Sequence, residues 1–400
     1  MNSRFDVKKD LPKSPKSLYV TIPAFKEPDI ITTLKSILNA DRTGLDIQVK
    51  VLINSSDTEI PEVVEINRRG EKEVKAFIHS QKCETWMHVD HVTLPSKYAG
   101  VGLARKTLMD AAARYFQDKD VNGLILALDA DCEIHRNYFQ VISKHFKTTS
   151  DQAASIFFEH PLQGTEVDTA IMEYEWHLRY FINLQKWAKF PFAIHTVGSS
   201  MCCYSEAYLL RGGMNKRKAG EDFYFLHKFI KDEICGEING TTVFPSGRIS
   251  DRVPFGTGRA VGKYEDETYV ATTYNSTMFK ILKLWNSQVE LYYRGSKPHE
   301  VHPALDLYLE SIDFDIKIQK LLKHVKSLKA FKKRFYQLFD AFQLMKCLHH
   351  MRSDFPDVPI LKSAQFYFDQ IEKGESTENL SLRRALLKIR QLDRQRNDLS

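Results

Sequence analysis

The segment LILALDADCE (residues 124–133) runs from an apolar stretch directly into two aspartates, Asp129 and Asp131. Residues 123–128 are apolar throughout, which is typical of a central strand covered on both faces. In open α/β sheets ligands bind at the carboxyl ends of strands, where carboxylates can hold a hard divalent cation together with substrate phosphates. We therefore expect Asp129 and Asp131 to bind Mg²⁺ or Mn²⁺. The alternative is that both aspartates only cap a helix that starts near Asn137.

Toward the amino terminus, short β-branched runs alternate with amphipathic stretches, as in βαβ units. Strands are expected at residues 18–22, 47–53 and 91–94, and helices near residues 30–37 and 103–116. The pattern predicts an α/β fold with a mainly parallel sheet flanked by helices.

Downstream, residues 153–158 predict another buried strand and residues 168–189 a long aromatic-rich helix. Apolar residues spaced by three or four from Ile318 to Phe342 predict one long amphipathic helix, and residues 382–389 predict a shorter one. We expect an amino-terminal tail (1–16), an α/β domain (17–295) and a helical carboxyl-terminal extension (296–400).

The composition is that of a globular protein with a large core: 400 residues, 43% apolar, 27% charged, with a formal net charge of +6. The mild positive excess suits anionic substrates or lipid headgroups and does not require nucleic acid. The six cysteines lack the spacing of a disulfide framework, and the first residues lack an apolar signal-peptide core. No apolar run approaches the ~20 residues that span a bilayer. We expect a cytoplasmic protein, free or peripheral to the inner face of the membrane.

Gly220, Glu221 and Asp222 form a second acidic signal at the start of a predicted helix, with Phe223 and Leu226 expected on its buried face. Acidic residues at a helix start can be capping groups favoured by the helix dipole. A paired Glu and Asp can instead supply a general base whose pKa is raised by burial or by a like-charged neighbour.

Six segments, in order along the chain, resemble the nucleotide-sugar-dependent glycosyltransferases of family 2, which have the Rossmann-related GT-A fold. They are TIPAFKEP (21–28), LINSSD (52–57), GVGLARK (100–106), LALDAD (126–131), GSSMCCY (198–204) and GED (220–222). Lys26 and Lys106 stand where this family usually has asparagine, and Asn54 stands where an aspartate is expected. The resemblance implies a metal-dependent, inverting transfer of a sugar from a nucleotide-diphosphate donor to an acceptor hydroxyl. Because the QxxRW signature of processive synthases is not found, we expect non-processive transfer. The resemblance implies a role in cell-surface glycan or glycolipid synthesis.

The resemblance also implies a role for each candidate site residue. Asp131, with Asp129, would hold the metal that bridges both phosphates, and Asp129 would also touch the ribose or the donor sugar. Asp222 would be the catalytic base, with Glu221 beside it in substrate binding. The nucleotide and its phosphates would lie near the remaining candidates, which are Pro23, Ala24, Phe25, Glu27, Asp57 and Arg105.

Several other features of the sequence each allow two interpretations. Arg252 and Arg259 are either diphosphate ligands or exposed arginines, and His299 and His302 match a late metal ligand of the family by position only. The aromatic helix is either buried or an acceptor wall. The lysine-rich flank from Lys317 to Lys333 is either a solvated face or an attachment to anionic lipid or a partner helix.

Two other functions fit parts of the sequence. A haloacid-dehalogenase-like phosphatase would use Asp129 as its nucleophile, but its motif continues with threonine or valine where this chain has Glu133. A non-catalytic module could bind a nucleotide sugar or another protein, although the presence of Asp131 and Asp222 argues against it. The partners we expect are a nucleotide-sugar donor and a glycan or lipid-linked acceptor, without nucleic acid.

Overall fold

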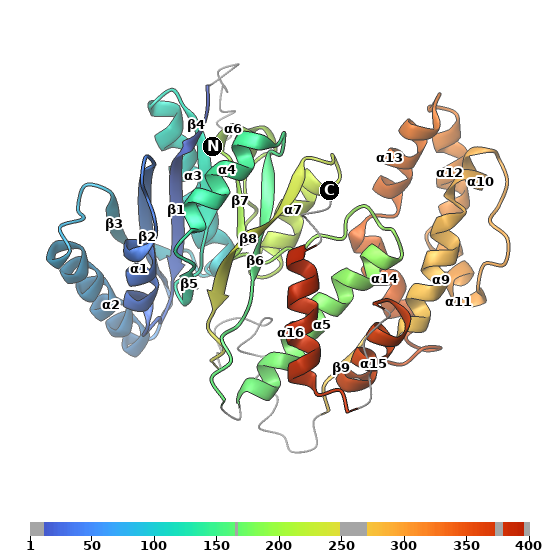
Figure 1. Cartoon of the computed structure of the whole chain (residues 1–400). Helices are drawn as coiled ribbons and strands as arrows, with labels where there is room; N and C mark the ends of the chain where they lie inside the picture. The colour runs from blue at the N-terminus through green and yellow to red at the C-terminus, as the bar shows by residue number, and fades with distance from the viewer. Residues whose placement is uncertain (1–11, 165–166, 249–269, 373–378, 396–400) are drawn as a thin grey trace. The chain divides into compact units, whose positions relative to one another are not determined.

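The computed structural model describes residues 12–164, 167–248, 270–372 and 379–395, which belong to two compact units (Figure 1). The first unit comprises residues 1–168, 196–262 and 390–400, and the second comprises residues 169–195 and 263–389. The units therefore differ from the expected domain ranges, because the aromatic helix groups with the carboxyl-terminal helices.

The first unit is built on a mixed sheet of eight described strands in the order β3-β2-β1-β4-β7-β6-β8-β5. Strands β1, β2, β3 and β4 are parallel to one another, as are β6 and β8, whereas β7 and β5 run antiparallel to their neighbours. The prediction of an α/β fold with a mainly parallel sheet is confirmed. The strands are β1 (Lys13–Ala24), β2 (Asp46–Ser56), β3 (Met87–Leu94), β4 (Asn122–Ala127), β5 (Cys132–Ile134), β6 (Ala153–Phe158), β7 (Met201–Tyr204) and β8 (Cys235–Pro245).

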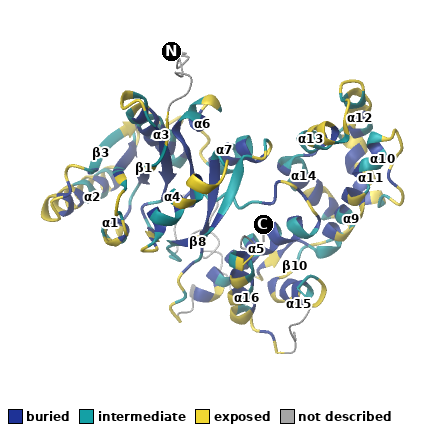
Figure 2. Ribbon diagram, turned by 45° about the horizontal axis from the view of Figure 1, so that its top comes forward, coloured by how far each residue is buried: buried dark blue, intermediate teal, exposed yellow. Residues whose placement is uncertain are grey.

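Helices cover this sheet and bury its strands (Figure 2). Every residue of β4 and of β6 is buried, as the uninterrupted apolar runs predict. Helix α3 packs on β1 and β4, while α1 packs on β5 and α4 on β8. The helices of this unit are α1 (Ile30–Asn39), α2 (Pro61–Ser80), α3 (Val101–Asp118), α4 (Tyr138–Thr148), α6 (Ser205–Leu210) and α7 (Glu221–Ile230).

The second unit is helical and has an aromatic core. Trp176 of α5 packs against Tyr180, Tyr367 and Phe368, and its indole Nε1 donates to Ser363 Oγ at 2.8 Å. This contact favours the buried interpretation of the aromatic helix. The elements are α5 (Val167–Trp187, in this unit from Thr169), β9 (Thr272–Thr273), α9 (Ser276–Ser287), α10 (Val289–Tyr293), α11 (Pro303–Ser311), α12 (Phe314–Leu322), α13 (Leu328–Leu338), α14 (Ala341–Met351), β10 (Val358–Pro359), α15 (Ile360–Gln370) and α16 (Leu382–Gln395), which continues into the first unit.

Three local predictions are wrong. The expected long helix from Ile318 to Phe342 is broken into α12, α13 and the start of α14, because Ser327 Oγ and Asp340 Oδ1 each accept a hydrogen bond from a backbone amide and cap a new helix. Residues 13–16 belong to β1 and not to a tail. In α7, Phe225 is buried where the sequence predicts Phe223. None of the described helices combines the length and apolarity needed to cross a membrane.

Candidate functional site

The candidate residues gather at the carboxyl edge of the sheet. In the strand order β3-β2-β1-β4, the chain adds β2 and β3 on one side of β1 and β4 on the other. The connections that leave β1 and β4 therefore diverge. Ligands of open α/β sheets bind at such a switch point. Pro23 and Ala24 end β1, and Glu27 follows them. Asp129 and Asp131 follow β4. The predicted position of both aspartates after a buried strand is therefore correct.

Arg105 of α3 joins the two acidic signals of the sequence. Its guanidinium donates to Asp129 Oδ1 at 2.6 Å and to Glu221 Oε1. Only 2% of the Arg105 side chain is exposed, and only 4% of the Glu221 side chain. Residues that are 24 and 116 positions from Arg105 thus meet on one buried cation. We call Arg105, Asp129, Glu221 and Asp222 the Arg105 cluster.

The electrostatics of this cluster raise the pKa of both acids at the start of α7. Burial raises the pKa of Asp222, and the charge of Asp129 raises it further, while Arg105 and the amides of Phe223 and Gly198 lower it in part. Burial also raises the pKa of Glu221, against the effect of Arg105. Burial alone would lower the pKa of Arg105, but Asp129, Glu221 and Asp222 raise it, so this guanidinium stays charged. Asp222 therefore lies within electrostatic reach of both Arg105 and Asp129.

Two glycines make this arrangement sterically possible. A Cβ at Gly198 would lie 2.7 Å from Arg105 Nη1, so any side chain at this position would displace the guanidinium. Gly220 precedes α7 with φ of 69°, in the left-handed region that favours glycine. Both glycines belong to segments quoted for the family resemblance. The backbone at the two positions sets where Arg105 and Asp222 lie.

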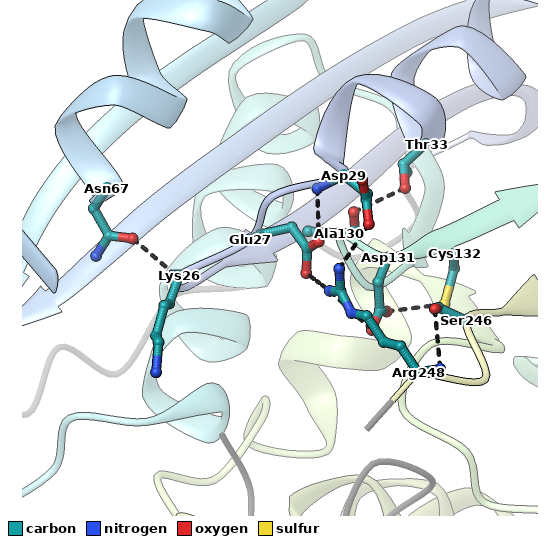
Figure 3. A network of polar contacts seen from close by, with 10 residues as sticks. All are labelled: Lys26, Glu27, Asp29, Thr33, Asn67, Ala130, Asp131, Cys132, Ser246 and Arg248. Carbon is teal, nitrogen blue, oxygen red and sulfur yellow. Dashed lines mark hydrogen bonds and ion pairs between the residues drawn. The ribbon is translucent and has the colours of Figure 1, made fainter. Parts of the chain in front are cut away.

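A second arginine, Arg248, binds three carboxylates at the same edge (Figure 3). It follows β8, and its guanidinium donates to Glu27 Oε2 and to Asp29 Oδ2 at 3.0 Å, and lies 3.6 Å from Asp131 Oδ2. The backbone amide of Ser246 donates to the Asp131 carbonyl at 3.1 Å. This hydrogen bond joins the segment after β8 to the segment after β4. Burial alone would lower the pKa of Arg248, but Glu27, Asp131 and Asp29 raise it. We call Arg248, Glu27, Asp29 and Asp131 the Arg248 cluster.

The end of β1 is fixed by hydrogen bonds to its neighbours. Asn54 Nδ2 donates to the Ala24 carbonyl at 2.8 Å. The amide of Lys26, whose φ is 51°, donates to Asn67 Oδ1 at 2.8 Å. Phe25, between them, is half-buried. Lys26 and Asn54, where the sequence departs from the family pattern, therefore both help to shape this turn.

Asp57 has a separate partner. It is exposed after β2, and its Oδ1 accepts from the Ser96 amide at 2.8 Å. Asp57 thus orders the chain that follows β3. Among the described residues, no hydrogen bond or ion pair joins it to the Arg105 or Arg248 cluster, so its predicted role in nucleotide binding stays a prediction.

The aspartates after β4 fit a divalent cation by their donor chemistry. The side chains of Asp129 and Asp131 are 37% and 25% exposed, and carboxylate oxygens are the ligands that Mg²⁺ and Mn²⁺ prefer. Among the described residues no group of three or more His, Cys, Asp or Glu is arranged to hold a metal. Mg²⁺, however, is commonly bound by one or two carboxylates with substrate phosphates and water as further ligands. The helix-capping alternative is not supported, because the residue at the N-cap position of α4 is Asn137, and Asp129 and Asp131 form ion pairs with arginines instead.

The remaining candidates are placed elsewhere or lie outside the described residues. Arg252 and Arg259 belong to the latter group. His302 accepts from the Ala304 amide at 3.2 Å and caps α11, and the His299 amide donates to Gln288 at 2.7 Å, both within the second unit. The sequence analysis misses Arg248 and Asn67. For Arg248 a signal exists in its place at the start of the arginine-containing segment RISDRVPFGTGRAV.

No protein-family model and no curated protein sequence matches this chain. Among solved structures, it resembles residues 1–349 of S. aureus TarS in complex with UDP-GlcNAc, at 12% identity and a TM-score of 0.41, over 82% of this chain and 92% of that chain. It also resembles GalNAc-T7 with UDP, GalNAc and Mn²⁺, at 12% identity and a TM-score of 0.38, over 85% of this chain and 58% of that chain. Each likeness is one of chain path at low sequence identity.

Proposed function

We propose that this protein is a metal-dependent, inverting glycosyltransferase that moves a sugar from a nucleotide-diphosphate donor to the hydroxyl of a glycan or lipid-linked acceptor. The proposal combines the order of the six sequence segments with the arrangement at the carboxyl edge of the sheet. The observation that carries it is the double contact of Arg105 with Asp129 and Glu221. This contact joins the DxD segment to the GED segment, as a single reaction centre requires.

Asp222 is the group we assign to the proton transfer. Burial and the nearby charge of Asp129 raise its pKa, which makes its ionised form a stronger base than an exposed aspartate. An Oδ atom of Asp222 takes the proton of the acceptor hydroxyl while the hydroxyl oxygen bonds to the anomeric carbon. The bond from that carbon to the diphosphate oxygen breaks, and its electron pair leaves with the diphosphate. A single displacement inverts the anomeric centre and needs no nucleophilic carboxylate.

The other residues position the donor in this proposal. The backbone of Pro23, Ala24 and Phe25, with Glu27 and Asp57, lines the nucleotide. Arg105 holds Asp129 and Glu221 in fixed positions, so that both can orient the donor sugar. Asp129 and Asp131 would hold Mg²⁺ or Mn²⁺, which when bound offsets the negative charge of the departing diphosphate.

A thermal-shift panel tests the donor side of the proposal. The full chain is heated with UDP, GDP, CDP, ADP or the corresponding nucleotide sugars, with and without Mn²⁺. We expect one nucleotide to raise the melting temperature, and more so with Mn²⁺, because a ligand that binds only the folded state stabilises it. Asp131→Asn should strongly reduce the Mn²⁺-dependent part and leave the unliganded melting temperature unchanged. Asp118→Asn, on the far end of α3 and outside both clusters, is the matched control.

The same preparation separates the two alternatives. A phosphatase would release phosphate from an aryl phosphate and would lose this activity in Asp129→Asn. A non-catalytic module would bind the nucleotide sugar identified by the panel without transferring or hydrolysing it, and Asp222→Asn would then have no activity to remove. The glycosyltransferase assignment requires a sugar product with inverted anomeric configuration, followed by NMR.

A further inference from the structure

The strongest concentration of unbalanced charge in the chain lies on two helices of the second unit. Residues 316–339 contain eight lysines or arginines and no aspartate or glutamate. They form most of α12, the turn after it and all of α13, two helices that pack against each other (Figures 1 and 2). We call residues 314–338 the basic hairpin. This charge is independent of the candidate functional site and of the function proposed for it.

The basic hairpin is anchored by its apolar face, which leaves the cations outside. Phe314 and Ile318 of α12 and Phe331 and Phe335 of α13 are buried. Asp315, the one acid within the hairpin, pairs with Lys297, and Glu290 of α10 pairs with Lys332 of the hairpin. Lys332 is thus neutralised by a neighbouring acid, whereas most of the other cations of the hairpin are not. Six cations are exposed and make no ion pair with a described residue: Lys317, Lys320, Lys323, Lys326, Lys329 and Arg334.

An exposed apolar side chain lies among these cations. Ile316 is 53% exposed, and it shares one face of α12 with Lys320 and Lys323, which follow it by four and seven residues. Val325, in the turn between the helices, is half-buried. Ile316 therefore adds an apolar side chain to the same helix face as two exposed lysines. The combination suits a boundary where cations meet phosphates and an apolar side chain enters hydrocarbon.

We propose that the basic hairpin docks this protein on an anionic lipid bilayer. Its lysines lie against the headgroup phosphates, and Ile316 inserts at the boundary with the acyl chains. Lysine predominates here over arginine, and lysine acts as a hydrated point charge that is well suited to a diffuse anionic surface. A nucleic-acid surface would instead favour arginine and polar side chains that contact sugar and bases.

Vesicle sedimentation with the full chain tests this inference. We expect binding to phosphatidylcholine vesicles that contain 30% phosphatidylserine, and little binding to phosphatidylcholine alone. Each lysine near an anionic surface contributes about a fivefold factor, so the triple variant K320Q/K323Q/K326Q should bind about 100-fold more weakly. The matched control K35Q/K72Q/K147Q removes three exposed lysines of the first unit and should bind like the parent protein. Raising NaCl from 0.1 to 1 M should also release the protein, because the screening length falls from about 10 Å to about 3 Å.

Ile316→Gln distinguishes a lipid surface from other polyanions. It leaves every charge in place and should weaken vesicle binding about tenfold, the scale of burying one large aliphatic side chain. Binding to heparin or to a DNA duplex should not change. Equal binding of both triple variants to the vesicles would overturn the inference. So would a preference for DNA over vesicles that is insensitive to Ile316, which would identify a nucleic-acid surface instead. Circular dichroism checks that each variant is folded.

Discussion

The Arg105 cluster and the Arg248 cluster lie at the same edge of one sheet and differ mainly in burial. Each arginine binds more than one carboxylate, but the Arg105 side chain is 2% exposed and that of Arg248 is 24% exposed. Arg105 belongs to the amino-terminal part of α3 and lies against the backbone of Gly198, whereas Arg248 lies in the segment after β8. The first arginine is therefore fixed as part of the core, and the second can exchange partners at lower cost.

Asp222→Asn is expected to have the largest effect, because it removes the proposed base from the buried cluster. Positioned acid–base groups contribute about 10²- to 10⁴-fold, so sugar transfer should fall by that factor. Nucleotide binding in the presence of Mn²⁺ should stay as in the parent chain. Initial rates and isothermal titration measure the two effects. Full activity of this variant would remove Asp222 from the base role.

The stability of Asp222→Asn provides an internal control. The folded-state pKa of Asp222 is raised above its ordinary value of 3.8, so the protonated form is favoured in the fold. The stabilisation that comes from this protonated carboxyl is fully present at a pH below the ordinary pKa, and it is lost as the pH rises through the folded-state pKa. The amide that replaces the carboxyl cannot ionise, so the variant should gain stability over the parent as the pH rises above the ordinary value. Urea unfolding at several pH values measures this gain, and a variant that loses stability at neutral pH would contradict the raised pKa.

Arg105→Met is expected to have the next largest effect, on stability. It leaves Glu221 buried without its cation, and breaking a buried pair in this way costs about 3–5 kcal/mol. The double variant R105M/E221Q should recover part of the loss because the uncompensated charge is also removed. Arg248→Met, the matched change in the half-exposed cluster, should cost no more than about 1 kcal/mol. Similar losses for the two single variants would erase the difference between the clusters.

Asp131→Asn should weaken binding of Mn²⁺ in the presence of the nucleotide. The loss of one charged contact is worth about 1.5–3 kcal/mol, or about 10- to 100-fold in affinity. Electron paramagnetic resonance of free Mn²⁺ measures this directly, without sugar transfer. Asp29→Asn is the control: Asp29 also binds Arg248 but lies outside the DxD segment, and its variant should retain the affinity within about fivefold. An unchanged affinity in Asp131→Asn would exclude this residue as a metal ligand.

Arg248→Gln is expected to have the smallest effect and the opposite sign. The Arg248 guanidinium lies 3.6 Å from Asp131 Oδ2, where it competes with any cation for that carboxylate. Removing a half-exposed competitor should tighten Mn²⁺ binding by up to about fivefold. The same resonance titration measures it. Weaker binding of Mn²⁺ would show that Arg248 helps to hold the cation complex and does not oppose it.

The regular part of the fold can be predicted from local pattern. The apolar runs predict β6 with its observed bounds, and β2, β4, α1 and α3 within a few residues. A strand buried on both faces is a continuous apolar run, and a helix buried on one face has apolar residues every three or four positions. The breaks in the long helix after residue 318 escape this pattern, since Ser327 and Asp340 cap new helices without interrupting the apolar spacing.

The candidate site can be predicted only in part. Asp129 and Asp131 are placed at a strand end because the strand before them is entirely apolar. Arg248 cannot be placed in this way, because its contact depends on β8 running parallel to β6 and ending near Asp131, which is a matter of strand order across the sheet. The grouping of the aromatic helix with the second unit is equally invisible, since it depends on contacts such as Trp176 with Ser363, 187 positions away.

Side-chain character over a few neighbouring residues is enough to establish the α/β class, the apolar strand that presents the two aspartates and the acidic start of α7. Which charges meet is settled only by tertiary contacts. Arg105 binds both acidic segments, and Arg248 joins the end of β8 to the end of β1. The free energy of an ion pair depends on distance and burial, and for residues far apart in the chain both are set only when the strands have assembled.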